Sequence, residues 1–107
     1  MDREMLLFQT RQDFIDLHQA LHRGETVTVE RYDRIARELM KMDQDNFELM
    51  LKFSEQTEGI KMHQMWETIS AYIDQLKKKG DWRKHKETQL SWKDGVLFVN
   101  GKAARPF

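Results

Sequence analysis

The chain has 107 residues, of which 34% are charged and 10% aromatic, with no cysteine and a formal net charge of zero. This composition is typical of a folded domain rather than a disordered tail, and the length suffices to bury about 65% of the surface of the unfolded chain. The lack of cysteine excludes a disulfide framework and a thiolate metal site. Without a run of 18 apolar residues or a signal-peptide pattern, we expect one cytoplasmic domain over residues 1–107 that makes no membrane contact.

The neutral total hides a charge asymmetry along the chain. Residues 1–76 hold nine Lys and Arg against fifteen Asp and Glu, a balance of −6. Residues 77–107 hold nine against three, a balance of +6. Such a basic end can bind an acidic partner, or it can fold onto the acidic part of its own chain, and the sequence leaves both alternatives open.

The first predicted helix covers residues 2–22 and ends near Gly24, which suits a left-handed helix stop. One face is apolar, and further apolar residues lie to one side of it. The face consists of Leu6, Leu7, Phe14, Leu17, His18 and Leu21, and the side group of Phe8, Ile15 and His22. This arc is wider than one neighbouring helix requires, which predicts contact with two helices or with a second subunit.

A second helix should begin after Thr28, whose side chain we predict to be the N-cap. Its outer face carries three bases, Arg34, Arg37 and Lys41. These could contact nucleic-acid phosphates, but a solvated face with i,i+4 ion pairs is the simpler interpretation.

We predict a break or kink in the helical pattern near residues 43–45. Asp45 and Glu48 have the spacing of a helix cap and its reciprocal partner. Beyond the break, Leu49 and Phe53 lie opposite the buried stripe. A segment that is apolar on two faces is typical of the middle of a bundle or of a dimer interface.

The clearest helix is predicted over residues 60–79, where the apolar residues fall in one stripe roughly 120° wide. The stripe consists of Met62, Met65, Trp66, Ile69, Tyr72, Ile73 and Leu76. Three lysines and Gly80 follow it, so this helix marks the border between the helical part, residues 1–79, and a basic linker with strands over residues 80–107.

From residue 89 the pattern changes to a period of two. Asp94-Gly95 suits a type I′ turn, and closing the chain there pairs Trp92 with Leu97 and Leu90 with Val99. A second turn at Asn100-Gly101 would return residues 102–105 as a short third strand. An isolated hairpin is marginally stable, so its apolar face should cover the bundle. The predicted fold is therefore mainly α, a three- or four-helix bundle with a small C-terminal antiparallel β-hairpin or meander.

Groups that carry chemistry are few. His18 and His22 have the spacing of two metal ligands, but no third ligand is evident and His18 falls on the core stripe, so a hydrogen-bonded structural histidine is the commoner explanation. The sequence has no nucleophile elbow and no glycine loop for phosphate. We expect no catalysis, no metal and no cofactor.

The basic end is the best candidate for binding, because bases interleaved with aromatics can form either a protein interface or a nucleic-acid contact. The candidate residues are Trp82, Arg83, Lys84, Lys86, Trp92 and Phe98. In the simpler alternative, Trp82 packs on the bundle and the lysines complete a basic helix end. We also expect that deleting residues 81–107 leaves a soluble helical protein that has lost its partner.

These observations predict a small non-catalytic interaction protein, such as an adaptor, inhibitor or regulator of a larger machine. It would bind a protein partner, acidic where it meets the basic end, and would form a homodimer. Its size and composition resemble those of accessory proteins of bacteria and their phages, which is an association only. The alternative is a nucleic-acid-binding regulator that uses the same basic end.

Overall fold

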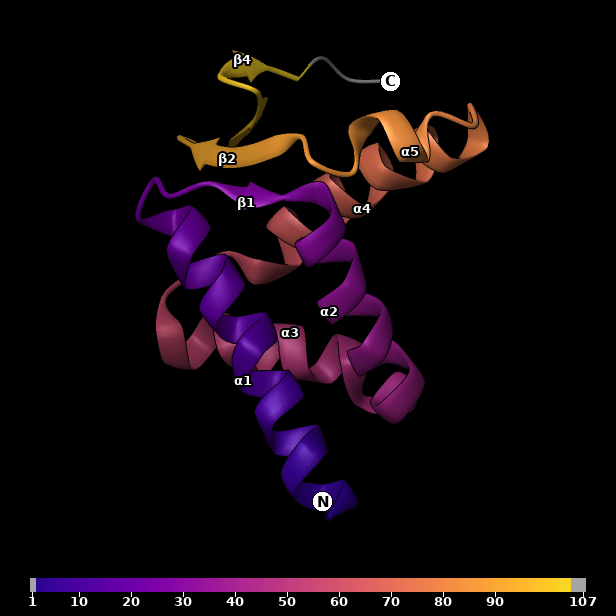
Figure 1. The fold of residues 1–107 in the computed structure, drawn as a ribbon. Helices are drawn as coiled ribbons and strands as arrows, with labels where there is room; N and C mark the ends of the chain where they lie inside the picture. The colour runs from indigo at the N-terminus through magenta and orange to yellow at the C-terminus, as the bar shows by residue number, and fades with distance from the viewer. Residues whose placement is uncertain (1, 105–107) are drawn as a thin grey trace.

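Helices make up most of the chain, and a small sheet is formed largely by its C-terminal residues. The computed structural model describes residues 2–104. Its helices are α1 (Arg3–His22), α2 (Val29–Asp43), α3 (Phe47–Glu58), α4 (Met62–Lys78) and α5 (Trp82–His85), with a 3₁₀ turn η1 (Gln44–Asn46). Its strands are β1 (Val27–Thr28), β2 (Gln89–Lys93), β3 (Val96–Val99) and β4 (Lys102–Ala103). The sheet lies across one end of the helices, and the start of α1 lies at the opposite end (Figure 1). The predicted mainly α fold with a β-meander is confirmed.

The first helix ends at the predicted residue and begins one residue after the predicted start. The Asp2 side chain caps it by accepting a hydrogen bond from the backbone N–H of Glu4. At the other end the N–H groups of Gly24 and Glu25 donate to the carbonyls of Leu21 and Ala20. This pair of hydrogen bonds is the Schellman arrangement, and it requires the left-handed conformation that Gly24 adopts, with φ of 87°.

The start of α2 is fixed by two parts of the chain. Thr28 Oγ1 accepts from the backbone N–H of Arg31, so the predicted N-cap is confirmed. The N–H groups of Val29 and Glu30 donate to the main-chain carbonyls of Thr88 and Lys86, at 3.0 and 2.8 Å. Because the first N–H groups of a helix have no partner inside it, residues 86–88 complete the N-terminal cap of α2.

The predicted break after α2 is confirmed, but the predicted cap is wrong. The N-cap position of α3 is Asn46, and no side chain caps that helix. The Asp43 carboxylate instead accepts hydrogen bonds from Asn46 Nδ2 and from the Arg11 guanidinium of α1. These bonds lower the pKa of Asp43 and hold the turn η1 against α1, so the break is organised around Asp43 rather than Asp45.

The core is built on the stripe of α4, whose residues are buried as predicted except for Trp66, which is half-buried. Phe14, Tyr32 and Phe47, from the first three helices, surround the ring of Trp66, with centroid distances of 5.9, 6.2 and 5.0 Å. One aromatic cluster therefore ties α1, α2, α3 and α4 together, which explains why the stripe of α4 is the strongest in the sequence.

The meander has the predicted register. Leu90 pairs with Val99 and Trp92 with Leu97, and Asp94 and Gly95 both have positive φ, as a type I′ turn requires. The face with Leu90, Trp92 and Leu97 is buried in the core. The predicted third strand is β4, while Arg105 lies outside the described residues.

The sequence did not reveal β1. This two-residue strand pairs with β2 through Val27 and Leu90, and it lies beside β2 although some 60 residues separate them in the chain (Figure 1). Two residues are too few to show a period, so only the fold exposes this pairing. Within residues 2–104, no helix combines the length and the apolarity needed to cross a bilayer.

Candidate functional site

The predicted binding residues begin on α5, a single helical turn that follows the end of α4. Gly80, with φ of 73°, ends α4 in the same arrangement that ends α1, because Gly80 and Asp81 donate to the carbonyls of Lys77 and Leu76. The Asp81 carbonyl then accepts from the N–H groups of Lys84 and His85. The expected polar linker is thus partly helical, and its four-residue helix is too short to show a periodic pattern.

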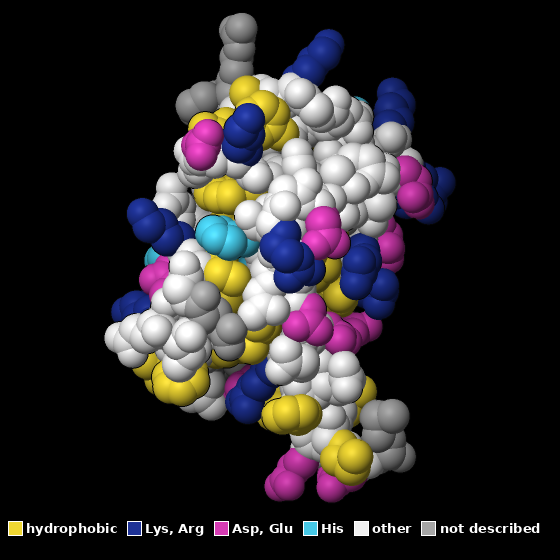
Figure 2. Space-filling view, turned by 90° about the vertical axis from the view of Figure 1, so that its left-hand side faces the viewer, with side chains coloured by type: hydrophobic (Ala, Val, Ile, Leu, Met, Phe, Trp, Pro, Cys, Tyr) yellow, Lys and Arg dark blue, Asp and Glu magenta, His cyan; other side chains and the backbone are white. Residues whose placement is uncertain are grey.

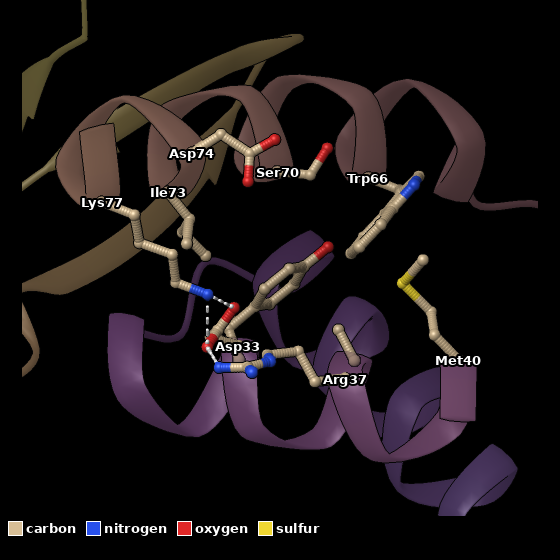
Figure 3. Close-up of a pocket in the computed structure, with 10 residues that line it drawn as sticks. Asp33, Arg37, Met40, Trp66, Ser70, Ile73, Asp74 and Lys77 are labelled. Atoms are coloured by element: carbon tan, nitrogen blue, oxygen red, sulfur yellow. Dashed lines mark hydrogen bonds and ion pairs between the residues drawn. The ribbon is translucent and has the colours of Figure 1, made fainter. Parts of the chain in front are cut away.

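Trp82 is held in place by Lys77 of α4. The Lys77 ammonium donates to both oxygens of Asp33, at 2.9 and 3.1 Å, and lies 5.0 Å from the centroid of the Trp82 ring. Arg37 reaches the same carboxylate at 3.6 Å. Figure 3 shows Arg37 and Lys77 meeting at Asp33 from α2 and α4. Since Asp33 is buried, this network gives Trp82 a defined position, half-buried against the core.

A shallow groove of about 450 Å³ lies between α2 and the α5 segment, and we call it the basic groove. Trp82 and Lys86 line it from the C-terminal part, and Arg34, Arg37 and Lys41 from α2. Its acids are Glu30, Asp33 and Glu38. Glu30 and Asp33 already pair with bases of the chain, whereas Lys41 and Lys86 have no ion pair among the described residues.

A second hollow of about 370 Å³ lies on the inner side of Asp33, between α2 and α4 (Figure 3). Trp66 and Met40 give it an apolar end, and Asp74 and Ser70 a polar rim. The Ser70 hydroxyl donates to the main-chain carbonyl of Glu67 rather than to a base. Its volume lies at the lower end of the range of small-molecule pockets.

The structure brings four of the six predicted binding residues together and separates two. Arg83 and Lys84 are exposed on α5, beside Trp82 and Lys86. Trp92 is buried and lines a different cavity near the hairpin turn. Phe98, half-buried, lies on β3 opposite Ser91, on the other face of the sheet from Trp92. The binding roles of all six stay predictions.

The basic end keeps most of its charge open to solvent. Among the residues that the structure describes, Lys77 is the one basic residue after position 76 that pairs with an acid of the acidic part. The exposed bases nearby are Lys78, Lys79, Arg83, Lys84 and Lys86. Folding of the basic end onto the acidic part therefore neutralises little of its charge, and a charged surface remains for a partner.

His18 is a structural residue, as predicted. Its Nδ1–H donates to the Phe14 carbonyl, which can only accept, and Nε2 therefore accepts from the Tyr32 hydroxyl, both at 2.8 Å. Burial lowers the pKa of His18 to about 4. Both ring nitrogens are thus occupied, and His22 is exposed. No group of three or more His, Asp or Glu side chains in residues 2–104 is placed to hold a metal ion.

The sequence pattern predicts an ordinary solvated face for the bases of α2. It does not predict that they line the basic groove. Arg34, Arg37 and Lys41 do share one face, which is the signal that the sequence offers. Residues 86–88 cap α2 and so bring the chain around Trp82 close to these bases. No local sequence pattern predicts this contact between α2 and residues 86–88. Comparisons with known protein families, with curated proteins and with solved structures find no match to this chain.

Proposed function

We propose that this chain is a small, non-catalytic interaction protein that docks an acidic protein partner through the basic groove and the adjoining face of α5. The observation that carries the proposal is the position of Trp82. Lys77 fixes its ring, and the exposed bases Arg83, Lys84 and Lys86 stand beside it without ion pairs in the described chain. A preordered Trp is typical of the energetically dominant part of a protein interface, and the bases around it would form a charged rim.

The groove suggests how such a partner would bind. Carboxylates of the partner would pair with Lys86 and Lys41, which need not give up an internal ion pair to do so. An apolar side chain of the partner would contact the open part of the Trp82 indole. Charge complementarity of this kind speeds encounter and fixes orientation, so binding should weaken as salt rises.

A nucleic-acid-binding regulator is the alternative function, because the same indole could stack on an unpaired base. The formal net charge of zero disfavours it, since dedicated nucleic-acid-binding domains usually carry a net positive charge. Fluorescence anisotropy with short single-stranded DNA and RNA at about 50 and 200 mM salt separates the two functions. Tight binding at low salt that falls steeply at high salt would support the alternative.

The proposal itself is tested with four baits in a quantitative pull-down from the source cells. The wild-type chain and a control with the distant exposed change Lys52→Glu should retain the same proteins. Trp82→Ala and the double variant Lys84→Glu/Lys86→Glu should lose them. Retention of the same proteins by all four baits would show that the basic groove is not the docking surface. The proposal also includes a homodimer.

A further inference from the structure

Large apolar side chains are exposed on two neighbouring helices at the end of the molecule away from the sheet. On α1, Met5 and Phe8 are 67% and 69% exposed, and on α3, Leu49 and Phe53 are 63% and 66% exposed. Single exposed apolar residues are common on protein surfaces, but four of this size on adjacent helices form a patch of the kind that marks interaction sites.

Phe8, Leu49 and Phe53 border a groove of about 480 Å³ between α1 and α3, which we call the apolar groove. Phe8 and Ile15 line it from α1, and Leu49, Met50 and Phe53 from α3. The apolar groove lies on the side of α1 away from the buried residues Phe14, Leu17 and Leu21. The apolar groove therefore accounts for the width of the apolar arc on α1, since Phe8 and Ile15 lie beside the main apolar face of that helix.

The first turns of α1 project beyond α3 (Figure 1), and hydrophobic side chains gather on the lower part of the face seen in Figure 2, including its projecting end. Leu6 is on the same side of α1 as Phe14 and Leu17, yet it is 40% exposed. The chain thus presents an apolar projection directly beside an apolar groove.

We infer that the apolar groove is the interface of a symmetric homodimer, in which the first turns of α1 of each copy lie in the groove of the other. This inference rests on the proposed function, for whose homodimer it names the surface. The projection and the groove share one helix, so a single twofold axis would cover both features in both copies. A twofold interface of this kind uses the same patch on each subunit.

The exposed area is sufficient for such an interface. A side chain of the size of Phe or Met carries about 150–250 Å² when fully exposed, so Met5, Leu6, Phe8, Leu49 and Phe53 present on the order of 600 Å². Two copies would bury about 1,200 Å², the lower limit for a specific protein interface. Because this small area must also offset the entropy lost on association, we expect a weak dimer, with a dissociation constant in the micromolar range.

Sedimentation equilibrium from about 1 to 200 µM, a range that brackets this dissociation constant, tests the inference. The wild-type chain should pass from monomer to dimer, and Phe8→Glu and Phe53→Glu should each weaken the association by at least about 30-fold, the loss expected at an interface hot spot. Val96→Glu, at an exposed apolar residue of β3, is the matched control and should leave the dissociation constant unchanged. Unchanged circular dichroism would show that the variants are folded.

Because the chain has no cysteine, single substitutions give specific crosslinks. Gln12→Cys, in the wall of the apolar groove, should yield a covalent dimer with a flexible bismaleimide, and Lys93→Cys at the hairpin should not. Three results would overturn the inference: a wild-type monomer at the highest concentration, no crosslink in the Gln12→Cys variant, or equal crosslinking in both variants.

The homodimer and the docking of a partner at the basic groove can be tested independently of each other. Trp82→Ala should leave the dimer intact and remove the captured partner. A wild-type monomer whose captured partner is lost in Phe8→Glu and Phe53→Glu would show that the apolar groove holds another protein, and the homodimer would be wrong.

Discussion

Asp33 of α2 and Lys77 of α4 form a bidentate ion pair, with Lys77 Nζ 2.9 Å from Oδ1 and 3.1 Å from Oδ2. In residues 2–104 this is the one ion pair that joins the acidic part of the chain to its basic end. The same ammonium lies over the Trp82 ring. One lysine therefore serves both the packing of the helices and the position of the residue that we expect to bind a partner.

Replacing Lys77 with Met should destabilise the fold by about 1–2 kcal/mol, because the buried Asp33 carboxylate would keep only the longer contact with Arg37. Urea unfolding followed by circular dichroism measures the change. Lys78→Met is the matched control, since Lys78 is exposed and has no ion pair in the described chain, and it should change the free energy of unfolding by less than about 0.5 kcal/mol. Equal effects of the two substitutions would contradict this role of the ion pair.

The buried His18 predicts acid sensitivity. In the unfolded chain the imidazole takes up a proton near its usual pKa of 6.5, whereas in the folded protein its pKa is about 4. The unfolded state therefore binds more protons between these two pKa values. The contribution of His18 to the free energy of unfolding is thus fully present above pH 6.5 and falls as the pH drops toward 4. The total loss should be roughly 3 kcal/mol.

Urea unfolding at about pH 7, 5.5 and 4 measures this loss, and His18→Gln should remove most of the dependence on pH in that range.

The Asp43 carboxylate affects the free energy of unfolding in a lower pH range. Arg11 and Asn46 lower the pKa of Asp43 from its usual 3.8, so its contribution is present above that value and is lost as the pH falls through the lower, folded pKa. Asp43→Asn should therefore leave the slope between pH 6.5 and 4 unchanged. A wild-type protein equally stable at both ends of this range would contradict the burial of a neutral His18.

The meander is part of the core, which reverses the expectation that residues 81–107 are dispensable. Their deletion would remove the fully buried Leu90, the partner strand of β1 and the carbonyls that cap α2, and the truncated chain should unfold. Leu90→Ala should cost about 2–5 kcal/mol in the free energy of unfolding. Thermal unfolding followed by circular dichroism measures both changes.

Val96→Ala is the control for Leu90→Ala, because Val96 lies on the outer face of the same hairpin and is exposed, and its effect should be small. A truncated chain that keeps its helical spectrum and a cooperative unfolding transition would restore the view of the C-terminal part as a separate binding tail.

The candidate site could be predicted in part. Bases interleaved with aromatics pointed to α5, and Trp82, Arg83, Lys84 and Lys86 do lie together there. Trp92 is near these residues in sequence, but the strand register places its side chain in the core. Local spacing places a residue on a face of its own element, and it does not say which other element covers that face.

The sequence by itself determined the longer helices and the hairpin of this protein. Periods of about 3.6 and 2 residues, the Thr28 cap, the Gly24 and Gly80 stops and the Asp94-Gly95 turn are local features, since each depends on side chains and dihedral angles within a few residues. The tertiary structure decided what these elements contact. The pairing of β1 with β2, the capping of α2 by residues 86–88 and the exposed groove between α1 and α3 join residues far apart in the chain. Such contacts depend on the packing of the whole fold, which no single stretch of sequence encodes.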